Sequence, residues 1–133
     1  MSNDFTEIIP GLWMGGTYSP VIPTGFDAVV CCREVTDWAL IGVPFLHLPM
    51  VDWSTLPKAW LIRGGEAFLD EVVERSSQKA LVHCAEGHNR SGLVVGYYLI
   101  KYGYKPQDAI DLIRSKRPGA LSNQTFVDYL LSL

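Results

Sequence analysis

The sequence predicts a single α/β domain spanning residues 1–133, with a small, mixed and twisted sheet and helices packed mainly on one side. Three observations support this fold class. The chain has 133 residues, which is enough for one domain and too few for two. Short apolar segments between turn residues dominate the first half, and amphipathic helical patterns dominate the second. No repeat, low-complexity tract or linker-like segment divides the chain.

Four short strands are expected, because each segment is apolar and is bounded by turn residues. The first ends at Gly15 and Gly16, and a loop containing Pro20 and Pro23 follows it. The second has the apolar, β-branched sequence FDAVVCC, which suits a buried strand. In chain order, the expected strands cover residues 11–14, 26–32, 44–48 and 80–84.

Helices are expected through most of the second half, where apolar residues recur at helical spacing. Proline marks a first turn or an end, glycine marks a C-cap, and serine or asparagine marks an N-cap. The pair Gly64–Gly65 weakens the middle of the first helix. By these signals the helices begin at Pro57, Gly92, Pro106 and either Ser122 or Asn123, and the second and third end at Gly103 and Pro118.

Composition and charge exclude several classes of function. Eleven basic and fourteen acidic residues give a net charge of −3, so no broad basic surface exists for long nucleic acid or an anionic membrane. The longest apolar run, residues 93–100, is far shorter than the ~20 residues that span a bilayer. Three cysteines, two of them adjacent at Cys31 and Cys32, form no disulfide framework, and the first ten residues lack a signal-peptide pattern. We therefore expect a soluble, cytoplasmic protein in a reducing compartment, monomeric by default.

The segment Ala80–Gly92, with sequence ALVHCAEGHNRSG, carries the strongest chemical signal. It predicts a buried strand, a loop from Cys84 to Arg90, and the start of a helix. Backbone N–H groups of such a loop can turn inward, and the helix N-terminus adds partial positive charge, so together they form a phosphate-binding nest. Gly87 permits the tight curl, and the planar fork of Arg90 can hold two phosphate oxygens. The expected phosphate-binding residues are Ala85, Glu86, Gly87, His88, Asn89 and Arg90.

Cys84 lies at the mouth of this nest and is the candidate nucleophile. The dipoles that attract a phosphate also stabilise a thiolate, which is then in position for in-line attack on a bound phosphoryl group. Ser91 can donate a hydrogen bond to the sulfur, and His83 is expected to order the loop. The leaving oxygen needs a proton, and Asp52, in a loop between a strand and a helix, is the candidate acid and later base, with Asp37 in reserve.

The motif His83-Cys84-x5-Arg90-Ser91 resembles the signature of cysteine-dependent protein phosphatases. The chain is most similar to a compact dual-specificity phosphatase of the protein tyrosine phosphatase superfamily. Ile8–Gly16 resembles that family's first strand and turn, residues 117–126 resemble its closing helix pair, and the separation of acid and nucleophile, 84 − 52 = 32 residues, is typical. The resemblance implies hydrolysis of phosphate monoesters through a phosphocysteine intermediate, with no metal or cofactor. The implied substrate is phosphotyrosine, then phosphoserine or phosphothreonine, in proteins. Asn123 is implied to support the loop from Cys84 to Arg90, the phosphate loop.

Three alternatives remain open. The same chemistry can act on a non-protein phosphate, such as a nucleotide, an RNA 5′ end, or a sugar or inositol phosphate. A catalytically silent phosphate-binding module is the second alternative. A sulfurtransferase or arsenate reductase, which needs no aspartate acid, is the third. Glu86 departs from the family pattern by placing an acid in the loop, so we expect highly phosphorylated inositides to be poor substrates.

Some of these residues also allow simpler interpretations. The spacing of His83, Cys84 and His88 fits no metal-binding pattern, and we expect His88 at the rim of the pocket. Cys31 and Cys32 are expected in a core strand. Their alternative role is that of resolving thiols, which trap oxidised Cys84 reversibly, although nothing in the sequence places them near it.

Overall fold

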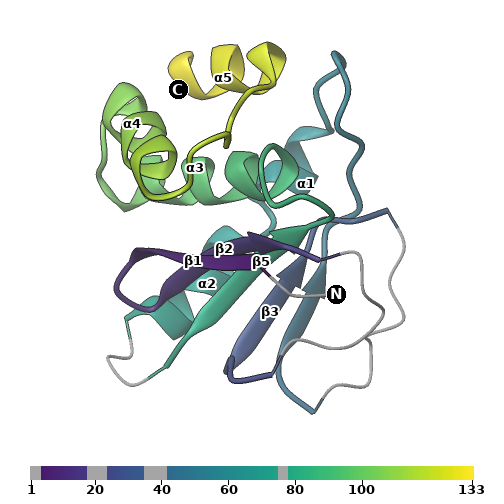
Figure 1. The fold of residues 1–133 in the computed structure, drawn as a ribbon, viewed down its shortest axis with the longest axis vertical. Coiled ribbons are helices and arrows are strands. Elements are labelled where there is room, and N and C mark those ends of the chain that lie inside the picture. The colour runs from purple at the N-terminus through teal and green to yellow at the C-terminus, as the bar shows by residue number, and fades with distance from the viewer. Residues whose placement is uncertain (1–3, 18–23, 35–41, 75–77) are drawn as a thin grey trace.

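The computed structural model describes residues 4–17, 24–34, 42–74 and 78–133. They form a five-stranded sheet with helices on one side (Figure 1), so the predicted fold class is confirmed. The strands are β1 (Asp4–Ile9), β2 (Leu12–Gly16), β3 (Ala28–Cys31), β4 (Phe45–His47) and β5 (Ala80–Cys84). The helices are α1 (Ala59–Arg63), α2 (Glu66–Val73), α3 (Arg90–Tyr102), α4 (Pro106–Lys116) and α5 (Gln124–Leu131).

The sheet has the strand order β1-β2-β5-β3-β4. Only the edge pair β1 and β2 is antiparallel, while β2, β5, β3 and β4 run parallel. The carboxyl ends of the parallel strands therefore meet at one edge of the sheet, which is where α/β sheets bind ligands. β5 lies in the middle, and its last residue, Cys84, reaches that edge.

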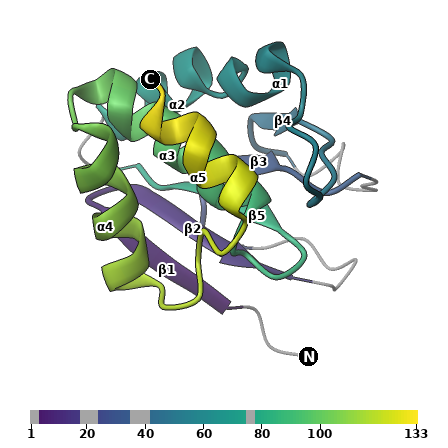
Figure 2. The same cartoon turned by 90° about the horizontal axis from the view of Figure 1, so that it is seen from above.

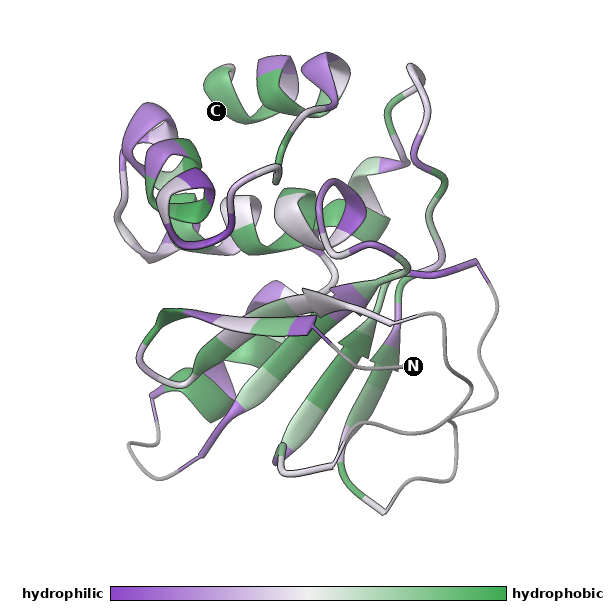
Figure 3. Cartoon of the chain, in the orientation of Figure 1, coloured by the Kyte–Doolittle hydropathy of each residue, from purple (hydrophilic) through white to green (hydrophobic). Residues whose placement is uncertain are grey.

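One face of the sheet packs against the helices. Met14, Val82 and Val30 form a buried row across the three central strands on this face. α3 is buried along the whole of residues 91–99, as expected of a helix that is apolar on every side. Figure 2 shows α5 crossing over α3, and Figure 3 shows the hydrophobic residues concentrated in the central strands. Within the described residues, no helix is both long and apolar enough to cross a membrane.

Two parts of the fold differ from the sequence-based expectation. Residues 4–9, which carry no clear strand pattern, form β1 at the sheet edge, where Glu7 is exposed and Thr6 is half-buried. The first predicted helix divides into α1 and α2 at its glycine pair. A Cβ at Gly64 would lie 2.9 Å from a Leu48 methyl, so the glycine lets the chain pass close to the core at this break.

β5 carries a fully buried histidine. His83 lies on the sheet face opposite the Cys84 side chain, because side chains alternate along a strand. Burial lowers the pKa of His83 to about 3, with positive charge at Arg33 and His47 acting in the same direction and a backbone hydrogen bond at Cys84 opposing them. The imidazole is therefore neutral at physiological pH.

We expect acid to destabilise the fold through His83. The unfolded chain protonates this residue near pH 6.5, whereas the folded protein holds it neutral down to about pH 3. Because the unfolded state binds more protons in this range, the free energy of unfolding falls as the pH drops from 6.5 to 3, by about 4 kcal/mol from this residue. Urea unfolding of the wild type and of His83→Gln across this range measures the effect. An equal slope in both proteins contradicts the prediction, and His88→Gln is the surface control.

Candidate active site

The loop from Cys84 to Arg90 is held between two rigid elements. Cys84 is the last residue of β5, and Arg90 is the first residue of α3, so α3 begins two residues earlier than the sequence suggests. The carbonyl of Cys84 accepts a hydrogen bond from the Thr17 N–H at 3.1 Å, which ties the start of the loop to the end of β2. The strand, loop and helix therefore lie as the sequence motif predicts.

Two hydrogen-bond donors face the Cys84 sulfur. The Gly87 N–H donates to Sγ across 3.2 Å, and the Ser91 hydroxyl lies 3.4 Å from Sγ. Cys84 is 2% exposed, and Ser91 is fully buried. Both groups can donate to a deprotonated sulfur, in a buried setting where bulk water contributes little.

The loop packs tightly against the end of β2. Gly87 has a φ of +74°, and a Cβ there would lie 2.2 Å from the backbone of Gly15. A Cβ on Gly16 would lie 2.3 Å from the backbone of Glu86 and 2.7 Å from that of Ala85. Gly87 is therefore required for both conformation and space, and Gly16 for space alone.

Arg117 holds the outer side of the loop, a role that the sequence reasoning missed. Its guanidinium is 4% exposed and donates to the carbonyls of Gly87 at 2.6 Å and Glu86 at 3.1 Å. Its remaining bonds reach β1, at Thr6 Oγ1 (3.0 Å) and Asp4 Oδ2 (2.9 Å). Carbonyls that point to Arg117 leave the N–H groups of the same loop free to face inward. The one sign of this role in the sequence is that Arg117 begins residues 117–126, the segment that resembles the family's closing helix pair.

Asp52 lies against the phosphate loop. Its Oδ2 accepts a hydrogen bond from the Asn89 amide at 3.0 Å, and its Oδ1 accepts one from the Asn123 amide at 2.8 Å. Two residues before Asp52, the Met50 carbonyl accepts a hydrogen bond from Arg90 Nη1 at 3.2 Å. The fold therefore brings the candidate acid to the loop that contains the candidate nucleophile. The reserve acid, residue 37, lies outside the described residues.

Asn123 connects α5 to both loops. It is the N-cap of α5, since its Oδ1 accepts a hydrogen bond from the Phe126 N–H at 3.2 Å. Its own N–H donates to Asn89 Oδ1 at 2.8 Å, and its amide also donates to the Trp53 carbonyl at 2.8 Å. Asn123 is therefore hydrogen-bonded to the phosphate loop at Asn89 and directly to the candidate acid, Asp52.

Glu86 and His88 lie at the outer rim of the loop. The side chains are 67% and 34% exposed, and the Glu86 carboxylate lies 3.6 Å from His88 Nδ1. Within the described part of the chain, no group of three His, Cys, Asp or Glu side chains is placed to hold a metal ion. The acid in the loop therefore faces solvent beside a histidine.

Comparison with known sequences identifies the family. A family model of the dual specificity phosphatase catalytic domain matches residues 18–133. The chain belongs to this family. The resemblance seen in the sequence is thereby confirmed, and the dual specificity phosphatase match covers the phosphate loop, the Asp52 loop and all five helices.

Two curated relatives of this dual specificity phosphatase domain come from Dictyostelium discoideum. MAP kinase phosphatase with leucine-rich repeats protein 3 is 45% identical over 135 residues, covering 95% of this chain and 15% of the relative. Probable protein tyrosine phosphatase type IVA B is 35% identical over 100 residues, covering 73% of this chain and 61% of the relative. The chain thus spans less than two thirds of either relative. The crystal structure of DUSP15 aligns with a TM-score of 0.83 and 21% identity over 98% of this chain and 87% of that one, which confirms the fold.

The dual specificity phosphatase fold places Cys32 beside Cys84. Cys31 pairs with His83 in the parallel ladder of β3 and β5, and the Cys32 N–H donates to the His83 carbonyl at 2.7 Å. Continuing this register by one residue sets Cys32 next to Cys84, and both side chains belong to the helix-covered core. Burial, followed by the nearby Cys84 and Cys31, raises the pKa of Cys32 well above its usual value. Cys31 points to the opposite face of the sheet.

We expect hydrogen peroxide to form a reversible Cys84–Cys32 disulfide. Adjacent strands lie about 4.8 Å apart, within the Cα range of disulfides. Peroxide converts the Cys84 thiolate to a sulfenic acid, and the Cys32 sulfur then displaces its oxygen as water. Thiol titration and peptide mass measurement detect the disulfide, and a dithiol reductant is expected to cleave it.

The matched control for this disulfide is Cys31→Ser, which keeps the Cys84–Cys32 pair and is expected to oxidise and recover as the wild type does. The Cys32→Ser variant is expected to accumulate sulfinic acid at Cys84, which the reductant does not reverse. Full recovery of Cys32→Ser after the same exposure would show that Cys32 is only a core residue.

Proposed function

We propose that this chain is a cysteine-dependent phosphatase that hydrolyses phosphate monoesters through a phosphocysteine intermediate. The observation that carries the proposal is the position of Cys84 Sγ, 3.2 Å from the Gly87 N–H and 3.4 Å from the Ser91 hydroxyl, at the start of a loop that ends in Arg90. A thiolate so placed faces any anion that the loop N–H groups bind.

In the first step, the phosphoryl oxygens of the substrate accept hydrogen bonds from backbone N–H groups of residues 85–90, apart from the Gly87 N–H that donates to Sγ, and from the guanidinium of Arg90. The Cys84 sulfur attacks phosphorus in line with the ester oxygen, and the P–O bond breaks as the S–P bond forms. Asp52, held beside the loop by Asn89 and Asn123, gives its proton to the leaving oxygen. This step leaves a phosphocysteine and a deprotonated Asp52.

In the second step, a water molecule attacks the phosphocysteine. Asp52 now accepts a proton from that water, and the S–P bond breaks to release inorganic phosphate. The departing thiolate accepts hydrogen bonds from the Ser91 hydroxyl and the Gly87 N–H. These bonds stabilise its negative charge and make the sulfur a better leaving group.

We infer that the substrates are phosphoproteins, with phosphotyrosine first and phosphoserine or phosphothreonine next, and that the protein acts in the cytoplasm. The net charge of −3 and the solvent-facing carboxylate of Glu86 favour a substrate with a single phosphate over a polyphosphorylated headgroup. A reducing compartment suits the three cysteines, none of which is in a disulfide, because the proposed chemistry depends on a reduced Cys84.

Phosphate release from an aryl phosphate, with chelator and reductant present, tests the proposal. We expect turnover by the wild type, loss of nearly all turnover in Cys84→Ser, and a loss of about 100-fold in Asp52→Ala. Activity that survives in Cys84→Ser rules out the phosphocysteine route. Phosphate release that survives in Asp52→Ala shows that Asp52 is not the acid. Phosphate binding without any turnover favours the silent module, and neither turnover nor binding favours the sulfurtransferase or arsenate reductase alternative.

A second prediction concerns the positioning of Asp52. Asn123→Asp keeps the oxygen that caps Phe126 but removes the amide donor to Asp52 Oδ1. We expect kcat to fall about tenfold for an alkyl phosphate, which needs a proton donor, and less for an aryl phosphate with an acidic phenol. Equal losses on both substrates would contradict a role through Asp52, and thermal unfolding checks that the cap is intact.

A further inference from the structure

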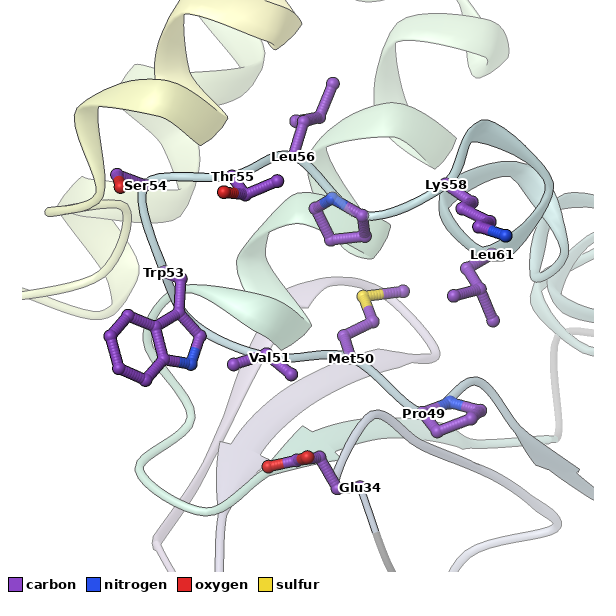
Figure 4. Close-up of a pocket in the computed structure, with 11 residues that line it drawn as sticks. Glu34, Pro49, Met50, Val51, Trp53, Ser54, Thr55, Leu56, Lys58 and Leu61 are labelled. Atoms are coloured by element: carbon purple, nitrogen blue, oxygen red, sulfur yellow. The ribbon is translucent and has the colours of Figure 1, made fainter.

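A hollow adjoins the loop that carries Asp52. It has a volume of about 620 Å³ and is formed by the loop of residues 49–58, with Glu34 and Leu61 completing its walls (Figure 4). Every residue of this stretch lines the hollow except Asp52, whose carboxylate is bound by Asn89 and Asn123 instead. The loop therefore has a catalytic side and a pocket side.

The pocket is mostly apolar. Its apolar lining includes Pro49, Met50, Val51, Leu56, Pro57 and Leu61. Trp53 stands at one end and Lys58 at the other, as Figure 4 shows. Trp53 is 67% exposed and Val51 is 37% exposed, so a sizeable apolar surface faces water here. Such exposed apolar surface beside an active site is typical of a binding site.

Two charged side chains lie in this lining, the carboxylate of Glu34 and the ammonium of Lys58. Within the described residues, no hydrogen bond or ion pair engages either group. Together they offer one acceptor and one donor with no net charge, which matches the N–H and C=O groups of a peptide backbone. An anionic lipid surface would instead meet the carboxylate of Glu34 and a chain of net charge −3.

We propose that this pocket binds a large apolar side chain of the phosphoprotein substrate, a few residues from the phosphorylated one. The inference rests on the proposed function and names the substrate feature that the same site selects. Its support is continuity: the Arg90 guanidinium, which holds the phosphate, donates to the Met50 carbonyl at 3.2 Å, and Met50 lines the pocket. An extended peptide advances about 3.3 Å per residue, so a segment anchored at the phosphate reaches the pocket within a few residues.

A phosphotyrosine peptide series tests the proposal. One leucine is moved through an alanine background on both sides of the phosphotyrosine, and kcat/KM is measured for each peptide. We expect one or two positions to raise kcat/KM about tenfold over the peptide without leucine, the gain typical of filling an apolar pocket. The affinity of Cys84→Ser for the same peptides measures the preference without turnover.

Trp53→Ala and Trp60→Ala form a matched pair of variants. The two tryptophans are similarly exposed, at 67% and 64%, but only Trp53 lines the pocket. The proposal predicts that the leucine peptide loses its advantage in kcat/KM over the alanine peptide in Trp53→Ala. In Trp60→Ala this advantage is expected to remain. The ratio is taken within each variant, so any general loss of activity cancels.

The outcomes separate this inference from the proposed function. Failure to hydrolyse a small aryl phosphate overturns the proposed function. Turnover of the aryl phosphate with no leucine preference, or with a preference that Trp53→Ala retains, overturns the pocket assignment alone. Binding to vesicles of anionic phospholipid that Trp53→Ala abolishes, without any peptide preference, assigns the pocket to lipid and overturns the inference.

Discussion

The hydrogen bonds from Arg117 to the phosphate loop set the geometry on which the site depends. A loop whose N–H groups face inward turns its carbonyls outward, and buried carbonyls without partners would make that shape unfavourable. Arg117 donates to the carbonyls of Glu86 and Gly87, and the glycines of β2 leave room for the loop beneath. Because the planar guanidinium presents its donors in a fixed fork, it defines the loop more narrowly than a lysine would.

The position of Asp52 depends on α5 in the same way. Asn123 caps that helix with its side-chain oxygen and binds Asp52 and the Trp53 carbonyl with its side-chain nitrogen. α5 is in turn fixed by Phe126 and Leu130, both fully buried in the core. Packing in the core thus sets where the Asp52 carboxylate lies, and under the proposed mechanism a core substitution in α5 acts on catalysis as well as on stability.

The sequence predicted those parts of the site that are contiguous in the chain. Residues 80–92 carry their own strand, turn and helix signals, so Cys84, Gly87 and Ser91 were placed by local reasoning. The role of Arg117 and the neighbourhood of Cys32 depend on strand order and on contacts between residues thirty or more positions apart, which local patterns do not encode. The split between α1 and α2 was signalled by its glycines, but its close approach to Leu48 was not.

Arg117 also joins the first strand of the sheet to the phosphate loop, since it bonds Asp4 and Thr6 as well as Glu86 and Gly87. During synthesis, the first strand of the sheet leaves the ribosome long before the arginine that it will hold. The phosphate loop therefore lacks its outer support until Arg117 has emerged, and Asp52 lacks one of its two amide donors until Asn123 has followed. A ribosome-bound chain that ends before these residues would hold Cys84 without the contacts that complete the site, so the site assembles late in translation.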